Sequence, residues 1–99
     1  MGPRERRMKL LLEEALTPLE IVIVDESARH HGHAGARPEG ETHYRLRIVS
    51  AAFEGLSRVA RARKVHELLG PEFADGLHAL ALDLKTPAEA ERERGNTSG

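Results

Sequence analysis

The strongest constraint on the fold is a strict alternation of apolar and polar residues over residues 42–50. The apolar positions are Tyr44, Leu46 and Ile48, and the polar positions between them are His43, Arg45 and Arg47. Successive side chains of a β-strand point to opposite faces of the sheet, so this alternation is typical of a half-buried strand. The chain is therefore expected to form a sheet that is covered on one side.

The segments around this strand have patterns of their own. Apolar residues recur with helical spacing over residues 4–16, a β-branched run follows at 19–24, and residues 25–41 have the polar, Gly-rich composition of a long loop. A second helix is predicted from its N-cap Ser57 to Leu69, a third strand over 77–85, and a short helix from Pro87. The order α-β-β-α-β-α predicts an α+β fold, with a three-stranded sheet and helices packed on one face.

Length and composition limit what else the chain can be. With 99 residues it can build one core, and we predict a single domain over residues 1–93 and a disordered tail over 94–99. No apolar run approaches the roughly 20 residues of a membrane span, and the first residues lack the apolar core of a signal peptide. A protein of the cytoplasm is expected, or of the mitochondrial matrix if the source is eukaryotic.

Recognisable catalytic motifs are lacking. Ser27 and Ser57 have no evident arrangement of histidine and carboxylate around them, and no Gly-rich phosphate-binding loop occurs. The chain has no cysteine, so a metal site built from this chain alone has to use histidine and carboxylate ligands. The expected role is docking onto a partner, not catalysis.

Several histidines are candidate metal ligands. His30, His31 and His33 crowd the predicted loop, where an imidazole could reach an open metal position without straining the core. A solvated loop that binds no metal in the cell explains these residues equally well. His78 opens the third strand on the side of Leu80, and its spacing alone favours a histidine at the edge of the core over a ligand. His43, at the start of a strand, is ambiguous.

The second helix has two candidate faces. Its packing face is predicted to contain Val59, Ala62, Val65, His66 and Leu69. A basic stripe is formed by Arg58, Arg61 and Lys64, and Arg45 and Arg47 of the second strand are candidates to extend it. A solvated helix face is the simplest interpretation of this stripe. The functional alternatives are a docking surface for an acidic or glutathione-bearing partner and a phosphate-contacting face for nucleic acid.

Four short motifs, in order, resemble the BolA family. They are Val24-Asp25-Glu26-Ser27; Gly40-Glu41-Thr42-His43-Tyr44; Phe53-Glu54-Gly55, followed by Arg61 and Arg63; and Gly76-Leu77-His78-Ala79-Leu80. The match covers about residues 8–90 in one unbroken register, and the family fold is similar to a type II KH domain. Family members commonly have a histidine between the two arginines, where this chain has Ala62.

The resemblance implies an adaptor that binds a monothiol glutaredoxin and shares a bridged [2Fe–2S] cluster with it and its glutathione. Such an adaptor would act in iron–sulfur cluster delivery or iron regulation. The constant cluster-binding histidine of the family falls at His78, and the segment with the variable loop ligand falls at His33. His30 and His31 remain alternatives for the loop ligand.

A second hypothesis, also associated with the family, is a DNA-binding transcriptional regulator that uses Arg58, Arg61 and Lys64. The net charge is −1, so any attraction to DNA has to be local to this helix. Alone, the chain is expected to be a monomer or a weak homodimer, without membrane attachment.

Overall fold

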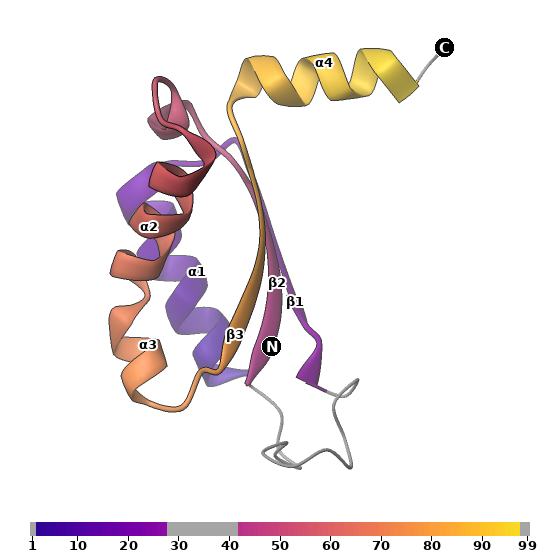
Figure 1. Ribbon diagram of the computed structural model, residues 1–99. Helices are drawn as coiled ribbons and strands as arrows, with labels where there is room; N and C mark the ends of the chain where they lie inside the picture. The colour runs from indigo at the N-terminus through magenta and orange to yellow at the C-terminus, as the bar shows by residue number, and fades with distance from the viewer. Residues whose placement is uncertain (1, 28–41, 98–99) are drawn as a thin grey trace.

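A computed structural model describes residues 2–27 and 42–97 of the chain and has a three-stranded sheet at its centre (Figure 1). Strand β1 (Glu20–Asp25) pairs antiparallel with β2 (His43–Val49), and β2 pairs parallel with β3 (Ala79–Lys85). The predicted α+β class with three strands is confirmed.

Three helices lie on one face of this sheet (Figure 1). They are α1 (Pro3–Leu16), α2 (Arg58–Leu68) and the short α3 (Gly70–Ala74). A 3-10 turn, η2 (Ala51–Phe53), follows β2 on the way to α2. Helix α4 (Pro87–Thr97) starts just after β3 and extends away from the helix layer (Figure 1). The opposite face of the sheet is therefore left uncovered by α1, α2 and α3.

The core fills the space between the sheet and the helix layer. Its buried side chains are Met8, Leu12, Leu16, Tyr44, Leu46, Ile48, Phe53, Val65, Leu69 and Leu77. The edge strands add partly buried residues, which are Ile21 and Ile23 from β1 and Leu80, Leu82 and Leu84 from β3. The alternation read from the sequence thus assigns the buried face of β2 and β3 correctly, because strand geometry alone fixes which side chains share a face.

The packing face of α2 differs from the predicted one. Val59 is 61% exposed and His66 is also exposed, so the prediction that both residues pack inward is wrong. His66 instead stacks on the ring of Phe73 in α3, with 5.2 Å between ring centroids. Arg61 is buried on α2 because the carbonyl oxygens of Leu56 and Leu84 and the carboxylate of Glu89 satisfy its guanidinium, as described below.

Two helix boundaries also differ from expectation. Gly70 and Pro71 end α2 as predicted, but they also begin α3, since a proline is tolerated in the first turn of a new helix. Helix α4 continues past Glu93, where the ordered domain was expected to end, to Thr97. Its charged residues are good helix formers, and Arg94 donates to Glu91 at 2.9 Å.

A buried carboxylate connects α1 to α3. Arg4 Nη1 lies 3.0 Å from Glu72 Oε1, and Arg7 Nε lies 2.8 Å from Glu72 Oε2. The hydrogen bond from Arg7 lowers the pKa of Glu72 despite its burial, and the positive charge of Arg4 acts in the same direction. The sequence alone gave no sign of this clamp, whose partners are more than 60 residues apart.

Candidate functional site

His78 lies directly before β3, at the end of the sheet where β2 begins. Its backbone N–H donates to the carbonyl oxygen of Thr42 at 2.9 Å, and the N–H of Ala79 donates to the same oxygen at 3.1 Å. These bonds fix the backbone of His78 to the start of β2. The side chain is exposed, whereas Leu80 packs against the core, so His78 does not serve as a core-edge histidine.

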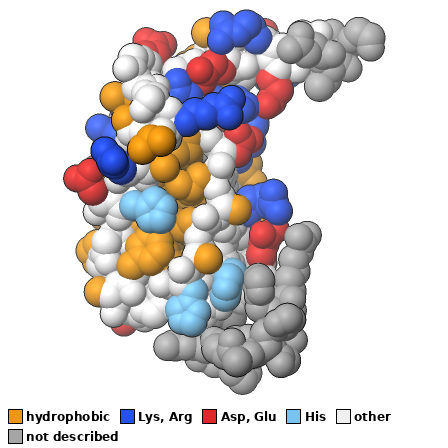
Figure 2. Space-filling view, viewed as in Figure 1, with side chains coloured by type: hydrophobic (Ala, Val, Ile, Leu, Met, Phe, Trp, Pro, Cys, Tyr) orange, Lys and Arg blue, Asp and Glu red, His pale blue; other side chains and the backbone are white. Residues whose placement is uncertain are grey.

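The structure brings His43 beside His78. The two rings meet edge to face, with centroids 5.8 Å apart and planes at 73°. Figure 2 shows pale blue histidine side chains close together near one end of the molecule. His43 is the first residue of β2 and stands opposite Ala79 in the parallel register, which explains the contact. Its Nδ1 lies 2.9 Å from Thr42 Oγ1.

Hydrogen bonds join Ser27 to Thr42, the two described residues on either side of residues 28–41. Ser27 Oγ accepts hydrogen bonds from the backbone N–H groups of Thr42 at 2.9 Å and of His43 at 3.1 Å. Ser27 is buried, and this bonding gives its hydroxyl a structural role in place of a nucleophilic one. The three loop histidines, His30, His31 and His33, lie outside the described residues.

This end of the sheet offers imidazole nitrogens but not a full ligand set. Within residues 2–27 and 42–97, neither ring nitrogen of His78 has a hydrogen-bond partner. No group of three or more histidine, aspartate or glutamate side chains that could hold a metal ion occurs in the same residues. A metal centre formed here would need further ligands from residues 28–41 or from another molecule.

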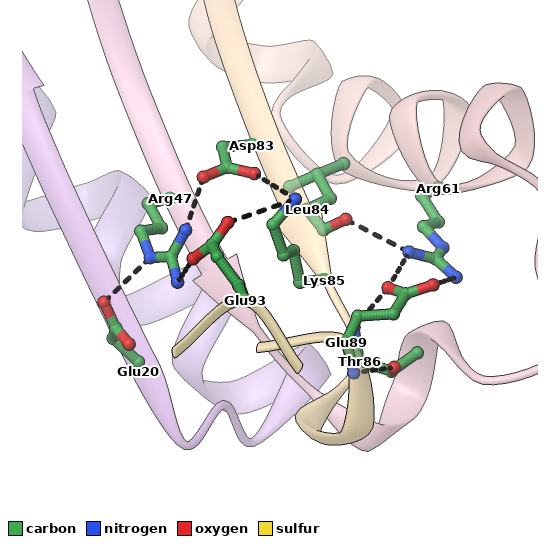
Figure 3. Close-up of polar contacts among 9 residues, drawn as sticks. All are labelled: Glu20, Arg47, Arg61, Asp83, Leu84, Lys85, Thr86, Glu89 and Glu93. Atoms are coloured by element: carbon green, nitrogen blue, oxygen red, sulfur yellow. Dashed lines mark hydrogen bonds and ion pairs between the residues drawn. The ribbon is translucent and has the colours of Figure 1, made fainter. Parts of the chain in front are cut away.

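Arg61, a member of the predicted basic stripe, is directed inward (Figure 3). Its guanidinium donates to the carbonyl oxygens of Leu56 at 3.0 Å and Leu84 at 3.1 Å, and to Glu89 Oε1 at 2.6 Å. The hydrogen bond from Arg61, assisted by the backbone N–H of Thr86, lowers the pKa of Glu89 to about 2. A side chain held in this way is not available to contact a phosphate.

The other basic residues do not continue the stripe. Arg45 and Arg47 lie on the uncovered face of the sheet, where Arg45 pairs with Glu26. Arg47 forms ion pairs with Glu20, Asp83 and Glu93 (Figure 3). Arg58 and Lys64 are exposed, but they border separate hollows. The hollow beside Arg58 adjoins α4, and the hollow beside Lys64 adjoins Ala15 of α1.

Within the described part of the chain, no helix has the length and apolar character needed to cross a membrane.

Comparisons with known proteins give the same family from sequence and from structure. A family model described as BolA-like protein matches residues 12–89. SufE-like protein 1, chloroplastic/mitochondrial, from Arabidopsis thaliana is 47% identical over 93 residues, which cover 90% of this chain and 25% of that protein. Protein BOLA1, chloroplastic, from the same plant is 47% identical over 89 residues, covering 88% of this chain and 56% of that protein.

A solved structure shares the fold over nearly its whole length. The BolA domain of SufE1 from Arabidopsis thaliana has a TM-score of 0.82 and 47% identity, covering 90% of this chain and 98% of that chain. The chain thus covers nearly all of that solved domain, whereas its matches span 25% and 56% of the lengths of the two relatives.

Proposed function

The chain belongs to the BolA-like protein family, and we propose on that premise that it is a non-enzymatic adaptor for a monothiol glutaredoxin. In this proposal the two proteins share a bridged [2Fe–2S] cluster, to which the glutaredoxin and its glutathione contribute the sulfur ligands. The adaptor acts in iron–sulfur cluster delivery or iron regulation, in the cytoplasm or, in a eukaryote, the mitochondrial matrix.

The observation that carries the proposal is the placement of His78. Its imidazole is exposed, its backbone is fixed by Thr42, and its ring nitrogens have no hydrogen-bond partner in the described residues. A ligand held by a rigid element presents its donor atom more reproducibly than one on a loop. His78 is therefore suited to anchor one iron atom.

The donor set fits half of a cluster. Two imidazoles replace two thiolates on one iron in Rieske-type [2Fe–2S] centres, and this substitution raises the reduction potential. His78 would supply one nitrogen and a histidine of residues 28–41 the other, while thiolates come from the partner because this chain has no cysteine. When bound, the cluster supplies one-electron redox chemistry and a transferable iron–sulfur unit.

The test is cluster sharing by a His78→Ala variant. Mixing the chain with a cluster-loaded monothiol glutaredoxin should change the visible spectrum of the cluster, and His78→Ala should abolish stable sharing. His66→Ala is the matched control, because His66 is also exposed but lies on α2 and stacks on Phe73. A folded His78→Ala protein that takes up the shared cluster with unchanged spectrum and lifetime would refute the assignment.

The loop ligand is tested in the same assay. We propose His33 for this role, and His33→Ala should alter the spectrum or lifetime of the shared cluster without affecting the fold. If only His30→Ala or His31→Ala alters the cluster, that histidine is the ligand.

DNA binding is less well supported by the observed geometry. Arg61 is engaged by Glu89, and Arg45 and Arg47 are ion-paired on the uncovered face of the sheet. Of the basic stripe, Arg58 and Lys64 remain exposed, and salt-dependent DNA affinity that both residues control would support the alternative.

A further inference from the structure

Strand β1 is an edge of the sheet, and part of its backbone faces outward, where no strand of residues 2–27 or 42–97 pairs with it. Among the described residues, β1 is hydrogen-bonded only to β2. The N–H of Glu26 donates to the carbonyl of His43 at 2.8 Å, and bonding alternates along an antiparallel pair. Val22 and Val24 therefore direct their backbone groups toward β2, while Ile21 and Ile23 direct theirs toward the open edge.

The side chains along this edge are apolar. Val22 and Val24 are 42% and 43% exposed on the uncovered face of the sheet. Beside the strand runs a hollow of about 230 Å³, lined by Glu5, Lys9, Ile21, Val22 and Ile23. An edge of β-branched residues whose outward backbone groups pair with no other described strand is the kind of surface to which another strand adds.

The opposite edge of the sheet is obstructed at the C-terminal end of β3. On β3 the outward carbonyl of Leu84 already accepts a hydrogen bond from Arg61 Nη1 at 3.1 Å. Asp83 and Lys85 place charges next to that position and are joined by an ion pair. Charged residues and occupied backbone groups are features that hinder strand addition, so the end of β3 is less open to it than the middle of β1.

We propose that β1 pairs antiparallel with β1 of a second copy of this chain, which joins two sheets into one of six strands. Ile21 of one copy exchanges backbone hydrogen bonds with Ile23 of the other, so every outward group of these two residues is used. Val22 then stands opposite Val22 of the second copy, on the two-fold axis and on the uncovered face. The pairing is self-complementary, as a two-fold interface requires.

The charges near β1 favour this register over the alternative in which Ile23 stands opposite Ile23 of the second copy. With Val22 opposite itself, Glu20 stands opposite Val24 of the second copy, and Val24 is the register partner of Arg45. An acidic residue of each copy then lies toward a basic residue of the other. With Ile23 opposite itself, Glu20 would instead face Glu26 of the second copy, and like charges directly opposite one another destabilise a pair of strands.

The chain allows a direct test because it has no cysteine. In a Val22→Cys variant the two thiols would lie on a non-hydrogen-bonded pair, with Cα atoms about 4.5 Å apart, a separation that a disulfide spans. Val24→Cys is the matched control, since it is equally exposed on the same strand and face. In this variant the Cα atoms of the two cysteines would be about 13 Å apart, because they are offset by four residues along the paired strands.

We expect Val22→Cys to form a disulfide-linked dimer at least about tenfold faster than Val24→Cys, because only its thiols are held at high effective concentration. Equal rates for the two variants, or faster crosslinking of Val24→Cys, would overturn the proposed pairing. Sedimentation of the unaltered chain gives a second measure. The mass should rise from 10.9 kDa toward twice that value between micromolar and millimolar concentration, and a constant monomer mass would refute the dimer.

Discussion

Arg61 on α2 donates two hydrogen bonds to the carboxylate of Glu89 on α4, at 2.6 and 3.1 Å. Glu89 also accepts from the backbone N–H of Thr86 at 2.9 Å, while the Thr86 hydroxyl accepts from the N–H of Glu89 at 3.2 Å. This reciprocal capping starts α4, and Arg61 connects the cap to α2. The same guanidinium binds the carbonyl of Leu84, so one side chain joins α2, β3 and α4 (Figure 3).

Replacing Arg61 should therefore destabilise the fold. Arg61→Met removes the hydrogen bonds to Leu56, Leu84 and Glu89, and we expect a loss of about 2 kcal/mol in the free energy of unfolding. Arg58→Met is the matched control on the same helix, because Arg58 is exposed, and its cost should stay below about 0.5 kcal/mol. Urea unfolding followed by circular dichroism measures both, and similar stabilities of the two variants would contradict the structural role of Arg61.

The ion pair of Glu89 predicts a loss of stability in acid. The pKa of Glu89 is lowered from 4.5 to about 2 in the folded protein, so folding favours the charged carboxylate. Its stabilising contribution is complete above pH 4.5 and is lost as the pH falls from about 4.5 toward about 2. The pKa of Glu72 is also lowered and adds to the same trend.

Glu89→Gln separates the contribution of Glu89 from that of Glu72. The glutamine cannot titrate, so the stability of the variant should fall less steeply than that of the unaltered chain as the pH drops below 4.5. Urea midpoints measured across this range give both slopes. Identical slopes would show that the carboxylate of Glu89 is not held in its charged form.

Glu72 offers a second test of stability at the contact between α1 and α3. Glu72→Gln leaves the buried guanidinium of Arg4 without its carboxylate, and breaking such a buried pair should cost about 3 kcal/mol. Asp75→Asn is the matched control. Asp75 also lies near Arg4 and Arg7, at 3.6 Å, but its side chain is 70% exposed, so the cost should be below about 1 kcal/mol. Equal effects in thermal unfolding would show that burial does not set the strength of these ion pairs.

The sequence predicts those parts of the fold that depend on local geometry. Tyr44, Leu46 and Ile48 are buried as expected, because the two-residue period of a strand needs no knowledge of its neighbours. Thr86 and Glu89 form the expected helix start for the same reason, since both partners lie within one turn.

Features that depend on partners distant in the sequence could not be predicted in this way. Arg61 looked like part of a surface stripe, but it is buried because it donates to Leu84 and Glu89, which are 23 and 28 residues away. The contact of His43 with His78 depends on the parallel register of β2 and β3, which spacing along the chain does not reveal. The family resemblance pointed to His78, but the position of His43 beside it came from the structure.

The isolated chain should not hold a stable [2Fe–2S] cluster. Such clusters are bound mostly through cysteine thiolates, and this chain has none. Anaerobic reconstitution followed by gel filtration should leave the protein essentially iron-free, whereas the mixture with a monothiol glutaredoxin should retain iron and sulfide. A stoichiometric cluster on the chain alone would contradict the proposed sharing of ligands.

His43 should act on a shared cluster by positioning His78. The ring of His78 is exposed, and its contact in the described residues is the edge-to-face packing on His43, whose Nδ1 lies 2.9 Å from Thr42 Oγ1. His43→Ala removes this support and gives His78 more rotamers, so the lifetime of the shared cluster should fall severalfold while its spectrum stays the same. His43→Phe keeps an aromatic ring without a ligand nitrogen, and it should preserve the lifetime. If both variants instead change the spectrum to the same extent, His43 is itself an iron ligand. If neither variant shortens the lifetime, the contact between the two rings has no role in holding the cluster, and His78 is positioned by its backbone bonds to Thr42 alone.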